Sequence, residues 1–258
     1  MISRLICVVF VLLGMLPLAQ AKERLHVAVA ANFAEPLKQI SAEFSTEHNV
    51  DIVQTVASSG TLYAQIIHGA PFDLFFSADA TRPDKLVEGG RVSASQVMTY
   101  AIGQLAYIDR NTQSPDLNSL KTFTLAPGTK LAMADPALAP YGLAAKETLA
   151  TLAMWQQVLP GVVYGKNVLQ AYQYYDTGNV DRALVAYSLV RQREPVFLIP
   201  LRYHQPIEQK MAITANAERQ ALARKFAHFM LSEPVQQQLV EFGYLPVSAS
   251  VKETTTNG

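Results

Sequence analysis

The sequence predicts an α/β protein with mostly parallel strands, and three observations lead to this prediction. Strand-like and helix-like segments alternate along the chain, which is typical of parallel sheets covered by helices. The chain has 258 residues, half of them apolar, enough for one large domain or two smaller lobes. Two apolar stretches, residues 100–108 and 209–214, are placed to carry the chain out of a first lobe and back into it.

The first elements are predicted directly after residue 24. Residues 25–30 (LHVAVA) alternate and are rich in valine, which predicts a strand. Residues 32–47 carry apolar side chains at helical spacing, which predicts a helix. Asn32 is its expected N-cap, Glu35 stands three residues later as in a capping box, and Pro36 is tolerated in the first turn.

The later elements follow from the same two periodicities. Strands are predicted at residues 50–56, 73–76, 130–134, 162–164 and 183–190. Helices are predicted at residues 82–88, 141–153, 168–177, 217–231 and 234–242. A further helix is expected to start at Ser59, its predicted cap, and to stop at Gly69.

The N-terminus predicts an export signal. Arg4 precedes an apolar stretch, residues 5–18, and an Ala-Gln-Ala end, the pattern of a signal peptide (residues 1–21) cleaved after Ala21. A membrane anchor is the alternative, but the stretch is short for a span. The single cysteine, Cys7, lies inside this signal, so the mature chain is expected to have no disulfide, thiolate metal site or lipid-modified cysteine. We therefore expect a soluble protein of a Gram-negative periplasm, with no direct membrane insertion after cleavage.

Charge and motif content argue against several function classes. The formal net charge is zero, and near −1 once Arg4 is removed, so the basic excess of a nucleic-acid-binding surface is missing. The five histidines lack the spacing of a zinc site, and Ser58 and Ser59 have no G-x-S-x-G context, so no enzyme is predicted. A ligand-sensing regulator is an alternative, but it would carry a helix-turn-helix and no export signal.

Four predicted helix starts carry polar or glycine-containing sequences. They are Asn32, Ser59, Pro140-Tyr141-Gly142 and Asn167-Val168. Any one of them alone is most simply a helix cap. Together they point to an anion site, because helix N-termini offer unpaired N–H groups and a partial positive charge beyond the carboxyl ends of the strands.

Longer motifs resemble those of a known family. They are V-A-A-N-F at residues 29–33, S-S-G-x-L-Y-A-Q-I at 58–66, G-A-P-F-D-L-F-F-S-A-D at 69–79 and A-P-Y-G-L-A-A at 139–145. These motifs are similar to those of the periplasmic molybdate-binding proteins of ABC importers, and the match covers nearly the whole mature chain. The resemblance implies a two-lobed type II periplasmic-binding-protein fold, with each lobe a mixed, mostly parallel sheet and the oxyanion held by neutral donors in the cleft.

The resemblance also implies lobe boundaries and binding residues. Lobe 1 would comprise residues 22–102 and 206–250, lobe 2 residues 103–205, and residues 251–258 a flexible tail. The implied ligand-binding residues are Ala31, Asn32, Ser59, Tyr141 and Val168. If the oxyanion is counted as a metal, the same residues are its metal ligands. Ser59 would act through its hydroxyl and amide, and Tyr141 and Val168 through their amides. Tyr187 is a sixth candidate, although the register of the match shifts by one residue there.

The residues restrict the anion only in part. Molybdate and tungstate are fully deprotonated near neutral pH and need donors alone, whereas protonated phosphate needs an acceptor, and none of the implied positions is acidic. Sulfate differs from them by size, and the sequence does not separate molybdate from tungstate. We expect no cofactor, a membrane permease as partner, and a monomer.

A binder of another anion such as sulfate is an alternative function, and a ferric-ion-binding periplasmic protein is the runner-up. Adjacent phenols at Tyr174 and Tyr175 resemble the tyrosine ligands of periplasmic iron-binding proteins. Neighbouring residues of a helix point about 100° apart, however, so the two phenols do not easily face one cleft.

Overall fold

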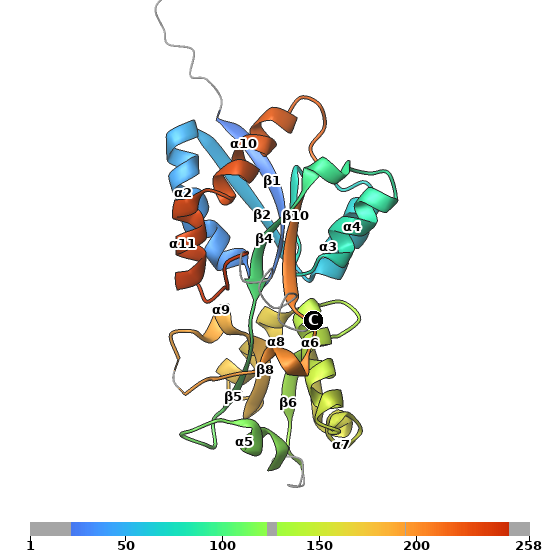
Figure 1. Cartoon of the computed structure of the whole chain (residues 1–258), viewed down its shortest axis with the longest axis vertical. Coiled ribbons are helices and arrows are strands. Elements are labelled where there is room, and N and C mark those ends of the chain that lie inside the picture. Colours follow the sequence, from blue (N-terminus) through green and yellow to red (C-terminus); the bar gives the residue numbers. More distant parts are fainter. Residues whose placement is uncertain (1–21, 123–127, 194, 248–258) are drawn as a thin grey trace, which may run out of the picture.

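The computed structural model describes residues 22–122, 128–193 and 195–247. Within this part the chain forms two five-stranded sheets, one above the other in Figure 1, each flanked by helices. This arrangement confirms the predicted two-lobed α/β fold. The predicted signal peptide at residues 1–21 and the predicted tail at 251–258 lie outside the described residues. Among the described helices, none combines the length and apolarity needed to cross a bilayer.

The first sheet has the strand order β2-β1-β3-β10-β4. Its strands are β1 (Glu23–Ala30), β2 (Val50–Ala57), β3 (Leu74–Phe76), β4 (Val97–Gly103) and β10 (Ile207–Ile213). Its helices are α2 (Ala34–His48), α3 (Ser59–Ile67), α4 (Thr81–Glu88), α10 (Gln220–Met230) and α11 (Glu233–Glu241). Helices α2, α10 and α11 cover one face and α3 and α4 the other (Figure 1). Successive side chains of β1 point to opposite faces of the sheet. Val27 packs in the core beneath α2, α10 and α11, and Ala28 packs in the core beneath α3 and α4.

The second sheet has the order β7-β6-β8-β5-β9. Its strands are β5 (Leu105–Asp109), β6 (Leu131–Ala134), β7 (Val162–Gly165), β8 (Arg182–Ala186) and β9 (Phe197–Leu198). Its helices are α5 (Leu117–Thr122), α6 (Pro140–Thr151), α7 (Trp155–Val158), α8 (Val168–Asp176) and α9 (Tyr187–Val190). Alanines on β6, β8 and α6 let the helices pack closely on this sheet.

The chain passes between the sheets at two adjacent places. It leaves through Gln104, between β4 and β5, and returns at residues 204–206, just before β10. At this junction β4 and β10 are antiparallel neighbours, with Gly103 opposite Ile207. The strands next to the two crossings, β4, β5 and β10, pair antiparallel with their neighbours. Among the described strands, parallel pairing joins β1 to β2 and β3, and β6 to β7 and β8.

Three local predictions were wrong. Helix α2 starts at Ala34 with no side-chain cap, because the Asn32 side chain donates to distant groups instead. The cap of α3 is Ser58, whose Oγ accepts from the Thr61 N–H, and not Ser59. The strand predicted at residues 183–190 ends at Ala186, and the apolar Tyr187–Val190 segment turns into α9.

A buried histidine at the return crossing makes stability depend on pH. His204 is 6% exposed, its Nδ1 donates to the Gln205 carbonyl at 2.7 Å, and its Nε2 has no partner among the described residues. Burial lowers the pKa of His204 below its ordinary 6.5, opposed by the Gln205 carbonyl and the Glu147 carboxylate. The folded histidine therefore stays neutral at a pH where the unfolded one is protonated.

The free energy of unfolding should consequently fall as the pH decreases through about 6.5. Urea unfolding at pH 7, 6 and 5 measures this slope, and His204→Asn should make it shallower by removing the imidazole while keeping a donor near Nδ1. His68→Asn, the same substitution at an exposed histidine, is the matched control. Equal slopes for wild type and His204→Asn would contradict this assignment.

Candidate oxyanion-binding site

One small cavity lies where strands of both sheets give way to helices. Its walls come from the turns after β1, β2, β3, β6 and β7. The lining residues are Ala30, Ala31, Asn32, Ser58, Ser59, Ala78, Ala139, Pro140, Tyr141, Asn167 and Val168. Five of the six residues implied by the sequence resemblance therefore line a single cavity, although they are up to 137 positions apart in the chain (168 − 31).

Ser59 is the first residue of α3 and is 1% exposed. Its Oγ accepts a hydrogen bond from the Ala78 N–H at 2.9 Å. Since that bond uses only an oxygen lone pair, the hydroxyl proton is left to donate. Capping by Ser58 orders the first turn of α3 behind it. Ser59 can thus offer a hydroxyl and a backbone N–H to one anion.

Asn32 lies in the turn after β1 and is 1% exposed. Its Nδ2 donates to Gln209 Oε1 at 2.9 Å and to the Tyr244 hydroxyl at 3.1 Å. Its carbonyl accepts from the hydroxyls of Tyr244, at 2.9 Å, and Ser188, at 3.1 Å. These four bonds fix the backbone of Asn32. Ala31 differs, because its N–H donates to the Ala57 carbonyl at 3.0 Å and only its apolar surface is left for the cavity.

The second lobe contributes two helix N-termini. Pro140 and Tyr141 open α6, and Gly142 lies so close to β6 that a Cβ there would stand 2.3 Å from the Ala134 carbonyl oxygen. Val168 opens α8, where the Asn167 side chain caps the helix by accepting from the Gln170 N–H at 2.9 Å. Both helices therefore direct their first N–H groups into the cavity region.

The cavity is rich in donors and has no formal charge. Within the described part of the chain, six residues that line the cavity have backbone N–H groups that donate to no other group: Asn32, Ser58, Ser59, Tyr141, Asn167 and Val168. None of the described residues that line the cavity is a Lys, Arg, Asp or Glu. Three of these N–H groups lie at the starts of α3, α6 and α8, where helix dipoles add partial positive charge. Such a set can bind an anion that brings acceptors only.

Direct contacts between the lobes surround this cavity. The Gly60 N–H donates to the Leu138 carbonyl at 2.9 Å, and Arg82, paired with Asp79, donates to the Ala137 carbonyl at 3.3 Å. The cavity volume of about 10 Å³ is close to one water-sized sphere. The two lobes are therefore in the closed arrangement.

The chain matches a family of binding proteins over most of its length. The profile of the family described as bacterial extracellular solute-binding protein matches residues 25–245. The chain belongs to this family. The molybdate-binding protein ModA of Rhodobacter capsulatus is 35% identical over 234 residues, 89% of this chain and 91% of that protein. ModA of Azotobacter vinelandii is 31% identical over 244 residues, 90% of this chain and 93% of the relative.

Solved structures show the same architecture. The periplasmic molybdate-binding protein of Azotobacter vinelandii aligns with a TM-score of 0.80 at 29% identity, covering 86% of this chain and 98% of that one. The sulfate-binding protein SubI of Mycobacterium tuberculosis aligns at 0.68 with 15% identity, covering 89% and 88%, and so shares the fold.

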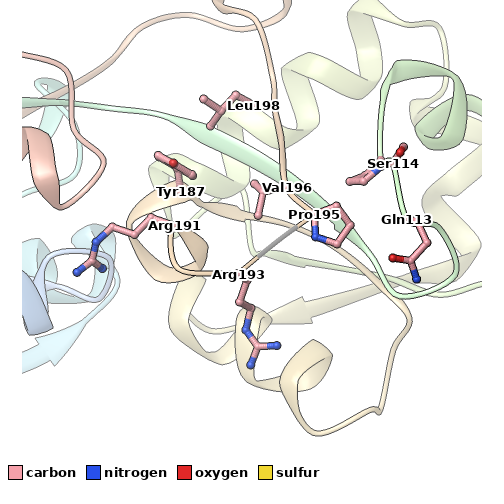
Figure 2. Close-up of a pocket in the computed structure, with 9 residues that line it drawn as sticks. Gln113, Ser114, Tyr187, Arg191, Arg193, Pro195, Val196 and Leu198 are labelled. Carbon is pink, nitrogen blue, oxygen red and sulfur yellow. The ribbon is translucent and has the colours of Figure 1, made fainter.

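The structure of this solute-binding protein does not bring Tyr187 to the cavity. Tyr187 begins α9, and its N–H donates to the Gln104 carbonyl at 2.9 Å. It lines a separate pocket of about 550 Å³, in which the Arg191 and Arg193 side chains point away from the apolar Val196 (Figure 2). Although this pocket is larger, its cations are already engaged. Arg191 donates to the Ser188 and Glu241 carbonyls, and Arg193 pairs with Asp176.

The tyrosines of the ferric-ion alternative also lie away from the cavity. Tyr174 and Tyr175 sit on α8, and the Arg110 guanidinium stacks 4.8 Å from the Tyr175 ring centroid. Burial raises the pKa of Tyr175, which disfavours the phenolate that iron requires. Among the described residues, no group of three or more His, Cys, Asp or Glu side chains is placed to hold a metal ion.

Sequence reasoning missed the polar residues behind the cavity. They are Tyr100, Ser188, Gln209 and Tyr244. One signal existed in the sequence, since Gln209 takes an inward position between Ile207 and Met211 in an otherwise alternating strand. A glutamine at such a position must find partners inside the protein.

Proposed function

We propose that this solute-binding protein captures molybdate or tungstate in the periplasm and delivers it to the permease of an ABC importer. The main observation is the cavity between the lobes, whose described lining has six unengaged backbone N–H groups, the Ser59 hydroxyl and no formal charge. The names of the two ModA relatives support molybdate as the ligand. In this proposal the protein is a monomer without catalytic activity or cofactor.

The donor set favours a bare dianion. Protonated phosphate would need an acceptor for its proton, and no carboxylate lines the cavity. Sulfate needs donors only, so its exclusion depends on a cavity sized for the larger molybdate, in which sulfate oxygens would stand too far from the donors. A tetrahedral oxyanion is larger than one water-sized sphere, so the facing walls must separate slightly to hold it.

Lobe closure completes the site in this proposal. The lobes, residues 22–102 with 206–250 and residues 103–205, would part to admit the anion and then close on it. Neither lobe alone supplies all the donors, because Asn32 and Ser59 belong to one and Tyr141 and Val168 to the other. The anion thus stabilises the closed form, which is the form that we expect the permease to recognise.

A thermal-shift screen tests the ligand. Molybdate and tungstate should raise the melting temperature strongly, because a ligand at about 1,000 times its Kd adds about 4 kcal/mol of stability. Sulfate and phosphate at the same concentration should have little effect, and excess sulfate should barely displace molybdate in calorimetry. A ferric-ion shift with a purple tyrosinate colour would instead support the iron alternative.

Affinity for molybdate should depend only mildly on salt. With no cation in the cavity, raising the ionic strength from about 0.01 M to about 0.15 M, which shortens the Debye length from about 30 Å to about 8 Å, removes little attraction. Calorimetric Kd values at the two salt concentrations measure the effect. A steep loss of affinity would show that Lys or Arg residues hold the anion.

A further inference from the structure

A buried polar network lies behind the cavity and spans both lobes. At its centre is Gln209 on β10, with a side chain that is 0% exposed. The β4–β10 pairing shifts register at Gln209 and Lys210, so the backbone is irregular where this residue points inward. A buried amide requires complete hydrogen bonding to be tolerated, and its partners identify what it holds.

The amide of Gln209 joins one cavity residue from each lobe. Its Oε1 accepts from Asn32 Nδ2 and from the Tyr100 hydroxyl, each at 2.9 Å. Its Nε2 donates to the Tyr141 hydroxyl at 3.1 Å. Asn32 and Tyr141 lie on opposite walls of the cavity, and both have unengaged backbone N–H groups. One planar amide therefore links the two walls.

A glycine makes room for this link. Gly103 ends β4 at the first crossing between the lobes, and a Cβ there would stand 2.3 Å from the Tyr141 hydroxyl and 2.6 Å from Gln209 Nε2. Any side chain at residue 103 would therefore displace the pair. The Tyr141 side chain thus extends from α6 to the crossing strands, while the start of the same helix faces the cavity.

We propose that Gln209 is a positioning residue that sets the spacing between the Asn32 and Tyr141 donors and thereby the size of oxyanion that the cleft accepts. This inference rests on the proposed function. Hydrogen bonds weaken steeply as distance and angle depart from their optimum, so the spacing that the walls take up when they separate to hold a large tetrahedral anion leaves a small one poorly bonded. Loosening the spacing removes that discrimination.

Two variants remove the link from its opposite ends. Gln209→Leu removes the amide, and Tyr141→Phe removes the hydroxyl while keeping the Tyr141 backbone N–H. Calorimetry should show about tenfold or greater loss of molybdate affinity in each, with a smaller loss or a gain for sulfate, so that the molybdate-to-sulfate ratio of affinities falls. The double variant should lose less than the sum of the two, because both changes break the same link.

A third variant tests spacing without deleting a hydrogen-bonding group. Gly103→Ala should lower the same affinity ratio by displacing the Tyr141 hydroxyl. Tyr107→Phe is the matched control, since it removes a buried tyrosine hydroxyl that donates to Asp109 at 2.9 Å within the second lobe. It should lower the melting temperature and leave the ratio unchanged.

The outcomes separate the two proposals. If wild-type protein binds no molybdate, the proposed function fails and the inference fails with it. If wild type binds molybdate selectively but Tyr141→Phe and Gln209→Leu keep the wild-type ratio, only the positioning role is overturned. Should Gln209→Leu not fold, Tyr141→Phe and Gly103→Ala still decide the question.

Discussion

Ser59→Ala weakens molybdate binding by about 1–3 kcal/mol in our expectation, the cost of leaving a buried hydrogen-bonding group without its partner. The change removes the hydroxyl that would donate to the anion. It also removes the acceptor of the Ala78 N–H, which is buried beside the cavity. Calorimetry measures the first effect, and urea unfolding without ligand measures the second.

The neighbouring serine is a matched control for this experiment. Ser58→Ala removes a hydroxyl of the same kind, but one that caps α3 by accepting from the Thr61 N–H at 3.2 Å. It should cost about 1 kcal/mol of stability through the lost cap and affect molybdate affinity less than Ser59→Ala. Unchanged affinity in Ser59→Ala would remove this residue from the site.

Phe33→Ala should have the largest effect on stability. Phe33 is 0% exposed, and its ring centroid lies 4.7 Å from that of Tyr100 and 5.6 Å from those of Phe76 and Tyr244. Removing a ring from such a cluster costs about 3–5 kcal/mol. Because Phe33 follows Asn32 and packs on the tyrosines of the polar network, molybdate affinity should fall as well.

A second core phenylalanine separates these two effects. Phe44 on α2 is also 0% exposed, and its ring centroid lies 4.9 Å from that of Phe226, within the core between α2 and α10. Phe44→Ala should lose a similar amount of stability with molybdate affinity unchanged. If both variants bind molybdate equally well, Phe33 acts only in the core.

Local patterns were enough to predict the elements that surround the cavity. The starts of α3, α6 and α8 follow from Ser-Ser-Gly, Pro-Tyr-Gly and Asn-Val sequences, because helix starts have strong local preferences. Because strands and helices alternate, the carboxyl ends of the parallel strands, and the helix starts that follow them, lie at the same edge of each sheet. These patterns placed Ser59, Tyr141 and Val168 at helix starts near one edge, and the resemblance to molybdate-binding proteins then named them as binding residues.

Long-range contacts account for what the sequence did not reveal. Asn32 has the local pattern of a cap, but its side chain bonds to Gln209, 177 positions away, and that partner decides its role. Tyr187 continues an apolar run, yet the strand stops at Ala186, where the Tyr187 N–H turns to the Gln104 carbonyl at the crossing. Neither partner can be identified from residues near it in the chain.

The pairing of Gly103 with Ile207 places both chain crossings side by side. Because the two crossings lie together, we expect the lobes to rotate mainly about an axis through them, with the donors of each lobe moving apart as they do so. A small rotation about that axis would separate the anion from the donors of one lobe in a single step. Release of the anion would then require only that the lobes open, with no change in the protonation or oxidation state of the anion.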